Sequence, residues 1–292
     1  MHNCNPAEKF VNFASLLDFM SDLCYDDTNE IYWEEPMKFG ICTSPDKAAM
    51  LKPGTLDYIE MNLSNVQKMT AQELADAKKI LENIGTPAEA ANGFFPGEVR
   101  LCGKDYKPQT VREYTERALD NAAYLGIHTC VLGSSKARNI EEGDDRDSCL
   151  AQFEEALVIA GDVATKYGTT VVLEPLNEKE ANYLNTVSEG AVICRRLAHP
   201  NILLLADYYH VAYAHEPMSI YTENADILRH LHISDPANRK YPMPDDGADY
   251  GPLAKALKDA GYNSRMSIEG GCPGEFVESA EIAIAYLRKL FA

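Results

Sequence analysis

Two glutamates stand at places where an apolar β-strand is expected to end. Glu174 lies in the run TVVLEP (170–175), and Glu269 lies in the run MSIEG (266–270). A carboxylate buried without a partner costs several kcal/mol of stability or stays protonated. These positions therefore predict that each carboxylate has a specific partner, and a metal ion is the simplest one.

Two further side chains that can bind a metal stand at comparable places. Asp207 closes the run ILLLAD (202–207), and His232 lies in the run HLHIS (230–234). Each has an ordinary alternative, because a strand-end aspartate often caps the next helix and a histidine in an apolar strand is usually a hydrogen-bonded core residue. We assign the core role to His230, which we expect to face away from His232.

Two glutamates, one aspartate and one histidine form an oxygen-rich set of ligands. Such a set suits one divalent metal ion, Mn²⁺ above all, with Mg²⁺, Co²⁺ and Zn²⁺ as alternatives. A positive ion would also allow the carboxylates to stay ionised side by side. The set requires a fold that brings the ends of four consecutive strands to one point.

Short apolar runs recur along the chain, and segments with helical spacing separate them. The runs cover residues 38–43, 56–61, 92–96, 128–133, 170–175, 202–207, 230–234 and 266–270. Strands alternating with helices over about 255 residues predict an α/β fold, a (β/α)₈ TIM barrel whose functional face lies at the C-terminal strand ends. A doubly wound sheet is the rival, but no G-x-G-x-x-G turn follows the first strand.

The first 36 residues stand apart from this repeat. Their apolar side chains have helical spacing at Phe10, Phe13, Leu16, Leu17, Met20 and Leu23. We predict an N-terminal helical extension over residues 1–36 that closes one end of the barrel, with a partner or dimer surface as the alternative. The catalytic barrel domain is predicted over residues 37–292, with no second domain.

The composition restricts the classes of partner. The 292 residues carry a net charge of −18 at pH 7, with a pI of about 4.8. Such a surface repels phosphate backbones and anionic lipids, so we expect no nucleic acid and no membrane partner. No apolar run approaches the roughly 18 residues of a membrane span. Eight scattered cysteines without a C-x-x-C motif indicate reduced thiols, and we predict a cytoplasmic protein.

Several segments resemble the xylose-isomerase-like TIM barrel superfamily, the sugar phosphate isomerase/epimerase family. EPLNEKEANYLNT (174–186) resembles the motif E-P-x-N-x-x-E-x-x-x-x-N-T, ADYYH (206–210) resembles D-x-x-H, and HISDPANR (232–239) resembles the seventh-strand motif that ends in Asn-Arg. The pattern is most similar to ketose 3-epimerases of the tagatose/psicose type, and it is also similar to hydroxypyruvate isomerase. The resemblance spans residues 38 to about 287 and is strong from Glu174 onward.

The resemblance implies a role for each matching residue. The implied metal ligands are Glu174, Asp207, His232 and Glu269, of which the two glutamates also form the acid/base pair. His210, Glu180 and Arg239 are implied to contact the substrate. Arg239 lies seven residues after His232, where these epimerases have six, and Pro236 is the candidate for the inserted residue.

The implied chemistry is proton transfer next to a carbonyl. One glutamate removes the proton and an enediolate forms, and the other glutamate returns a proton on the opposite face of the sugar. We therefore predict a metal-dependent sugar isomerase or epimerase that acts on a ketose or a related sugar. The loop GGCPGE (270–275) holds no Lys or Arg, which favours an unphosphorylated substrate.

Alternatives stay open at this point. One is a metal-dependent lyase or dehydratase that acts on a keto-inositol or an oxidised glycoside. Another is a non-catalytic sugar-binding barrel. A three-zinc DNA-repair endonuclease of the same superfamily is disfavoured, because the chain has seven histidines in all and an acidic surface. A homo-oligomer is compatible with the resemblance, although no surface pattern argues for it.

Overall fold

The computed structural model describes residues 24–25, 31–32 and 36–292. The chain divides into two compact units, Met1–Pro36 and Met37–Ala292. In the first unit, the described residues form two short strands, β1 (Cys24–Tyr25) and β2 (Ile31–Tyr32), which pair antiparallel. Residues 10–23, on which the predicted N-terminal helix rests, lie outside the described residues.

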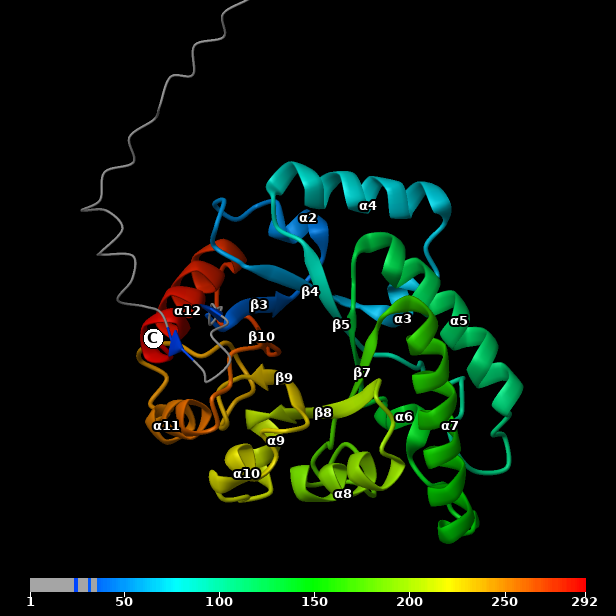
Figure 1. Cartoon of the computed structure of the whole chain (residues 1–292). Coiled ribbons are helices and arrows are strands. Elements are labelled where there is room, and N and C mark those ends of the chain that lie inside the picture. Colours follow the sequence, from blue (N-terminus) through cyan, green and yellow to red (C-terminus); the bar gives the residue numbers. More distant parts are fainter. Residues whose placement is uncertain (1–23, 26–30, 33–35) are drawn as a thin grey trace, which may run out of the picture. The chain divides into compact units, whose positions relative to one another are not determined.

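The second unit is a closed barrel of parallel strands, as Figure 1 shows. The strands are β3 (Lys38–Cys42), β4 (Tyr58–Asn62), β5 (Ala88–Asn92), β6 (Thr129–Leu132), β7 (Thr170–Leu173), β8 (Ile202–Asp207), β9 (Leu228–Ile233) and β10 (Arg265–Ile268). They follow one another around the barrel in chain order, and β10 closes it by pairing with β3. The predicted eight-stranded TIM barrel is confirmed.

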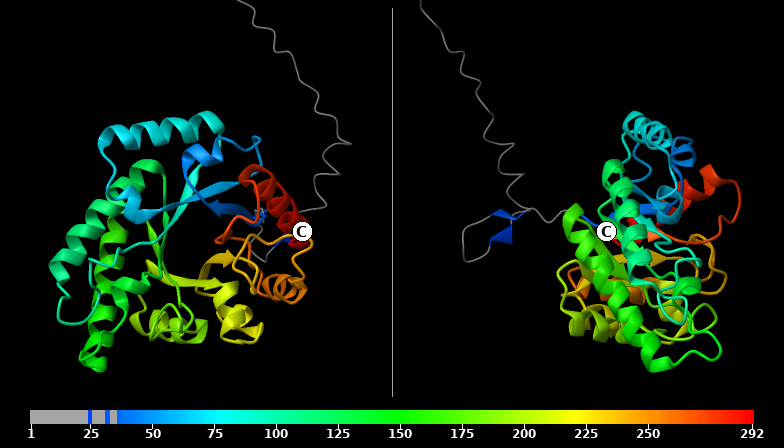
Figure 2. Two further views of the ribbon diagram at one scale, coloured as in Figure 1. Left: turned by 180° about the vertical axis from the view of Figure 1, so that it is seen from behind. Right: turned by 90° about the vertical axis from the view of Figure 1, so that its right-hand side faces the viewer.

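Helices surround the barrel on its outer side (Figure 2). They are α2 (Pro45–Ala48), α3 (Leu63–Val66), α4 (Ala71–Ile84), α5 (Pro108–Leu125), α6 (Ser135–Arg138), α7 (Arg146–Tyr167), α8 (Val187–Leu197), α9 (Tyr208–Tyr213), α10 (Ser219–Glu223), α11 (Gly251–Asp259) and α12 (Phe276–Leu290). Gly126 and Gly168 end α5 and α7 with positive φ angles of 88° and 62°, a conformation that favours glycine. Among the described helices, none has the length and apolar character needed to cross a membrane.

One strand lies elsewhere than the sequence predicted. The third barrel strand, β5, covers Ala88–Asn92 rather than residues 92–96. Its sequence AEAAN lacks the β-branched and aromatic residues that indicate a strand, and neighbouring strands rather than local propensity hold it in place. Phe94 and Phe95 follow it in a loop, where they are buried and stacked with ring centroids 4.6 Å apart.

The barrel interior has an apolar side and a polar side. Val131, Val172 and Leu205, from β6, β7 and β8, form a small cluster of their own, separate from the large core between strands and helices. The polar side is filled by buried residues of β4, β9 and β10: Tyr58, Glu60, His230, His232 and Ser267. Because β4 and β9 are not neighbouring strands, contacts between their side chains must cross the interior.

Candidate active site

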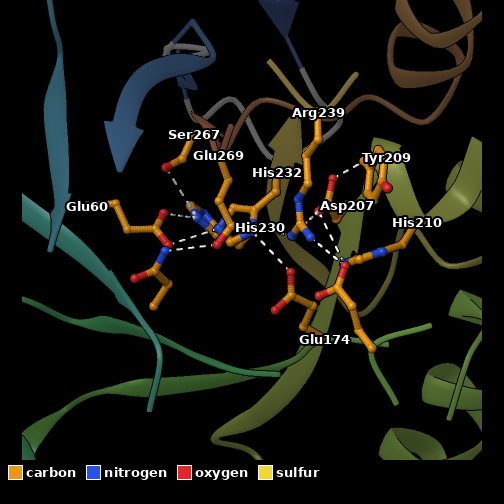
Figure 3. Close-up of polar contacts among 12 residues, drawn as sticks. Glu60, Glu174, Asp207, Tyr209, His210, His230, His232, Arg239, Ser267 and Glu269 are labelled. Carbon is orange, nitrogen blue, oxygen red and sulfur yellow. Dashed lines mark hydrogen bonds and ion pairs between the residues drawn. The ribbon is translucent and has the colours of Figure 1, made fainter. Parts of the chain in front are cut away.

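The four predicted ligands meet at the C-terminal ends of consecutive strands, as Figure 3 shows. Asp207 is the last residue of β8, and His232 lies near the end of β9. Glu174 and Glu269 each follow directly on the last residue of β7 and β10. One ligand atom from each of these residues, which we call the quartet, lies within 4.8 Å of the others. The parallel barrel brings these ends together because all its strands point the same way.

Burial and mutual repulsion dominate the acid groups of the quartet. Burial, followed by the charge of Glu269, raises the pKa of Asp207 to about 8 and also raises the pKa of Glu174. Burial alone would raise the pKa of Glu269 too, but His232 and Arg239 lower it to about 2. The quartet therefore contains more carboxylates than the nearby cations of the chain can keep ionised, and a bound divalent ion would reverse that balance.

One polar atom of the quartet and one beside it are buried and have no hydrogen-bond partner among the described residues. They are Asp207 Oδ2 and His210 Nε2, which lie 3.5 Å apart. The other oxygen of Asp207 accepts a hydrogen bond from the Tyr209 backbone N–H at 2.9 Å, so the aspartate also caps α9. Orphaned buried polar atoms are rare in proteins. Together with three carboxylates and one imidazole, they fit a site for an oxygen-preferring divalent ion.

His210 is held in one orientation by Asn177. The backbone N–H of Asn177 donates to His210 Nδ1 at 3.2 Å, and the Asn177 side-chain amide lies 2.9 Å from the same atom. Since Nδ1 accepts, Nε2 carries the proton and faces the quartet. Burial lowers the pKa of His210 to about 3, so the ring stays neutral. The neutral ring presents one N–H donor to whatever lies beside Asp207.

Glu60 holds two histidines across the barrel interior. His232 Nε2 lies 2.9 Å from Glu60 Oε1, and His230 Nε2 lies 2.8 Å from Glu60 Oε2. Burial alone would raise the pKa of Glu60, but His232 and His230 lower it well below its ordinary value. Glu60 is therefore a carboxylate that accepts from both rings. With Nε2 engaged, His232 presents Nδ1 to the quartet, at 3.1 Å from Glu174 Oε1.

The predicted direction of His230 is wrong. We expected His230 and His232 to face opposite ways, but side chains two residues apart in a strand share a face, and both rings point into the barrel interior. The predicted core character of His230 does hold, since it is fully buried and hydrogen-bonded. The sequence reasoning also missed Glu60, although YIEM carries the same signal as VVLE, a carboxylate inside an apolar run.

Arg239 reaches the quartet in spite of its shifted spacing. Its guanidinium donates to Glu269 Oε2 at 3.0 Å and also to Glu180, and it stacks 4.8 Å over the Tyr209 ring. The turn before it is closed by Asp235, whose backbone carbonyl accepts from the Arg239 N–H at 2.8 Å. Arg239 itself has a positive φ of 50°, a backbone conformation that non-glycine residues rarely adopt.

The Asp235 turn is also closed by side-chain hydrogen bonds. The two carboxylate oxygens of Asp235 accept from the Ala237 backbone N–H and from the Asn238 amide, both at 2.9 Å. The residues between Asp235 and Arg239 therefore form one closed unit. Pro236, the candidate for the inserted residue, lies inside this unit.

The segment after Glu174 is anchored by a buried arginine. Arg138 is fully buried and donates to the backbone carbonyls of Gly133, Tyr183 and Leu184. These bonds join the end of β6 to the segment that carries Glu180. A Cβ atom on Gly133 would lie 2.3 Å from Glu174 Oε2, so a side chain at this position would displace the carboxylate from where it lies. Neither Arg138 nor Gly133 gave a sequence signal for this role.

Comparison with known proteins identifies the family of this chain. The family model described as xylose isomerase-like TIM barrel matches residues 51–290. This chain belongs to that family. The predicted superfamily is thereby confirmed.

Among the relatives are named epimerases. The chain is 25% identical over 247 residues to D-psicose 3-epimerase of Agrobacterium fabrum, covering 82% of each chain. It is 30% identical over 203 residues to ketose 3-epimerase of Arthrobacter globiformis, covering 68% of each. These relatives confirm the expectation of an enzyme of the isomerase and epimerase class.

A solved structure shares the fold. The structure of D-psicose 3-epimerase with D-tagatose from Clostridium cellulolyticum superposes with a TM-score of 0.76 at 19% sequence identity. The match covers 87% of this chain and 99% of that chain. At this identity, the likeness supports the barrel fold.

Proposed function

We propose that this chain is a metal-dependent epimerase of an unphosphorylated ketose or ketose derivative. The observation that carries the proposal is the convergence of Glu174, Asp207, His232 and Glu269 at one point, with ligand atoms within 4.8 Å of one another. These four residues would hold one divalent ion, and Mn²⁺ suits their oxygen-rich set best. The names of the relatives, D-psicose 3-epimerase and ketose 3-epimerase, support the substrate class.

The two glutamates carry out the proton transfers in this proposal. Glu174 or Glu269 removes the proton from the carbon beside the carbonyl, and the other glutamate returns a proton to the opposite face, which inverts that carbon. A bound ion would supply the positive charge that polarises the carbonyl and offsets the negative charge developed on the enediolate oxygens. Because epimerisation is reversible, each glutamate acts as base in one direction and as acid in the other.

Other side chains bind and orient the reacting groups. The N–H at His210 Nε2 and the guanidinium of Arg239 donate hydrogen bonds to substrate oxygens near the reacting carbon. Glu180 accepts from a substrate hydroxyl and holds Arg239 in place. Asn92 donates to Glu269 Oε1 at 2.9 Å and keeps this carboxylate turned into the site. Glu60 positions His232 in the same way, as carboxylates behind metal-binding histidines commonly do.

The proposal is tested by isotope exchange. Metal-stripped protein is supplied with Mn²⁺ in D₂O and incubated with a panel of free ketoses. We expect deuterium at the inverted carbon beside the carbonyl and release of the epimeric ketose. Elimination products would contradict the epimerase proposal and indicate a lyase. Binding of a ketose without any deuterium exchange would contradict it and indicate a non-catalytic sugar-binding barrel.

The remaining expectations from the sequence stay proposals of the same kind. They are a cytoplasmic location, a reaction without nucleic acid or membrane partners, and a homo-oligomeric state. The acidic composition supports the absence of nucleic acid and membrane partners. Reduced thiols are also consistent with the free state of all six cysteines in the barrel unit, Cys42, Cys102, Cys130, Cys149, Cys194 and Cys272.

A further inference from the structure

A cavity of about 640 Å³ lies beside the quartet, which we call the side cavity. Its floor is formed at the ends of β3, β4 and β5 by Cys42, Glu60 and Asn92. Its outer wall comes from α2, α3 and α4, and α2 and α4 lie side by side at the top of Figure 1. The side cavity thus extends from the barrel mouth outward between helices.

The floor of the side cavity touches the quartet directly. Asn92 donates to Glu269 Oε1 at 2.9 Å, and Glu60 Oε1 lies 2.9 Å from His232 Nε2. The four residues of the quartet do not themselves line the side cavity. The side cavity therefore adjoins the space in which the reacting carbons must lie, and a molecule held at the quartet can extend into it past Asn92.

The volume of the side cavity exceeds what one small sugar requires. Pockets of about 300–1,000 Å³ enclose most of a drug-sized ligand, which has more atoms than a single hexose. The side cavity falls in that range without the space at the quartet. A free ketose bound at the quartet would leave most of it to water.

The residues that line the side cavity indicate the chemistry of the part of the substrate that it would hold. Asn62, Asn65 and Ser44, whose side chains carry amide or hydroxyl groups, belong to the lining. Such groups recognise hydroxyls. Met69 and Ile80 add apolar surface, on which the C–H face of a sugar ring can lie.

The charge of the lining restricts the ligand further. The lining contains the acidic residues Asp46, Glu73 and Asp76 and, among the described residues, no Lys or Arg side chain. A phosphate or carboxylate placed there would meet only like charge. Repulsion of this kind is a common basis of specificity, because it raises the free energy of the wrong complex.

We propose that the side cavity binds an uncharged, hydroxyl-rich second unit of the substrate, such as a sugar ring linked through a glycosidic bond to the unit that reacts. This proposal rests on the proposed function, since it places the reacting unit at the quartet. The preferred substrate is then a keto-sugar glycoside rather than a free ketose. Phosphorylated and carboxylated second units are excluded.

The first test narrows the side cavity. Ala77 of α4 is buried in the wall, and Ala77→Phe fills part of the cavity. We expect kcat/KM for a neutral keto-disaccharide to exceed that for the free ketose, and Ala77→Phe to lower the disaccharide value at least tenfold while the ketose value changes less than about twofold. Ala71→Phe, an exposed position on the same helix outside the lining, is the matched control and leaves both values unchanged.

A second variant keeps the test informative if Ala77→Phe does not fold. Asp76 is exposed on the rim, and Asp76→Arg places a cation in the lining at little cost to the fold. We expect it to raise kcat/KM several-fold for a ketose glycoside whose second unit carries a phosphate. Glu82→Arg makes the same charge change on α4 outside the lining and leaves this value near that of the unaltered protein.

The outcomes separate the two proposals. Equal effects of Ala77→Phe on ketose and disaccharide, or no effect of either lining variant, overturn the side-cavity proposal and leave the epimerase intact. If no sugar exchanges deuterium, the epimerase proposal fails. Calorimetric binding of the neutral disaccharide, lost in Ala77→Phe and kept in Ala71→Phe, would then still support the side cavity, and absence of binding would overturn it.

Discussion

The two ends of the barrel interior both hold charged side chains, but only one end has its charges balanced. Where the strands begin, Glu89 of β5 lies 3.0 Å from Lys38 Nζ and 2.5 Å from Arg265 Nε, so one carboxylate faces two cations. Where the strands end, four carboxylates crowd around His232 and Arg239: Glu60, Glu174, Asp207 and Glu269. The first arrangement is complete as it stands, whereas the second holds more carboxylates than its own cations keep ionised.

This difference distinguishes a structural ion-pair network from a functional one. Buried charges are tolerated when they are paired and hydrogen-bonded, and the network around Glu89 meets that condition. At the quartet, the raised pKa of Asp207 and its unpartnered Oδ2 mark an unmet requirement. Perturbed carboxylates that converge in this way are typical of sites where a protein binds an ion and carries out chemistry.

The largest effect is expected from removing one reacting carboxylate. Glu174→Gln or Glu269→Gln should lower turnover by a factor of about 10²–10⁴, since a positioned acid or base contributes about that much. The metal-free Glu174→Gln variant should unfold at the same temperature as the unaltered protein or higher, because burial and Glu269 disfavour the Glu174 charge, whereas Glu269→Gln should unfold at a lower temperature, because its contacts with His232 and Arg239 are weakened. Rates of deuterium exchange and thermal unfolding give the two measurements. Glu142→Gln, an exposed change, is the control, and near-normal exchange in either glutamate variant would contradict the assignment.

Metal addition should stabilise the end where the strands terminate. Mn²⁺ at 100 times its Kd would add about 2.7 kcal/mol to the free energy of unfolding if it binds only the folded protein. Thermal unfolding with and without Mn²⁺ measures this increase, and metal analysis should find one ion per chain. Asp207→Asn should lose the increase and Glu89→Gln should keep it. If Mn²⁺ stabilises both variants equally, or neither of them, the proposed difference between the two ends of the barrel is wrong.

A smaller effect is expected from Glu60. Glu60→Gln should weaken Mn²⁺ binding by a factor of about 10–100, because the carboxylate that fixes His232 Nε2 is lost. Calorimetric titration of the metal-stripped protein measures the Kd directly, without reference to turnover. Asp76→Asn is the matched control, since Asp76 lines the same cavity without contacting a histidine. Unchanged Mn²⁺ affinity in Glu60→Gln would show that Glu60 only fills space.

The smallest effect concerns the balanced end. Burial alone would raise the pKa of Glu89, but Lys38 and Arg265 lower it below its ordinary value. A lowered pKa contributes stability that is complete above the ordinary pKa of glutamate and is lost as the pH falls through the pKa in the folded protein. Glu89→Gln should therefore lower the free energy of unfolding by about 1–2 kcal/mol at pH 7. The difference should shrink below about pH 4, where glutamate protonates in the unfolded chain.

Urea unfolding at several pH values measures this dependence. Deuterium exchange in Glu89→Gln should stay normal, which would sharpen the contrast with the quartet. A destabilisation that is the same at pH 3 and pH 7 would mean that packing, and not the ion pairs, accounts for the effect of the substitution.

The sequence predicted the fold well because the barrel repeats one simple pattern. Strands such as Ile202–Asp207 combine β-branched and leucine residues with a charged end, and this pattern is visible in isolation. The strand Ala88–Asn92 was predicted at the wrong residues because alanine does not favour strands. Its position is fixed by the neighbouring strands of the barrel. The quartet was predictable for the same reason as the strands, since each carboxylate interrupts or ends an apolar run.

Other parts of the site could not be predicted from local patterns. Arg138 acts through backbone carbonyls of a distant segment, and no residue spacing reports such a contact. Glu60 was recognisable, but its partner is across the barrel, and the direction of His230 had to be correct before the pair could be seen. Asn92 lies in the strand that was misplaced, so its contact with Glu269 was hidden as well.

The closed turn at Asp235 has a consequence for how distant homologues are recognised. The carboxylate and carbonyl of Asp235 tie the intervening peptide to itself, so this hydrogen-bonded turn, and not the number of residues after His232, directs the guanidinium of Arg239 to the quartet, and chains with a turn of another length would meet the same requirement. Searches that demand a fixed interval from His232 to this arginine would discard such chains. A template anchored on the hydrogen-bonded loop would retrieve them.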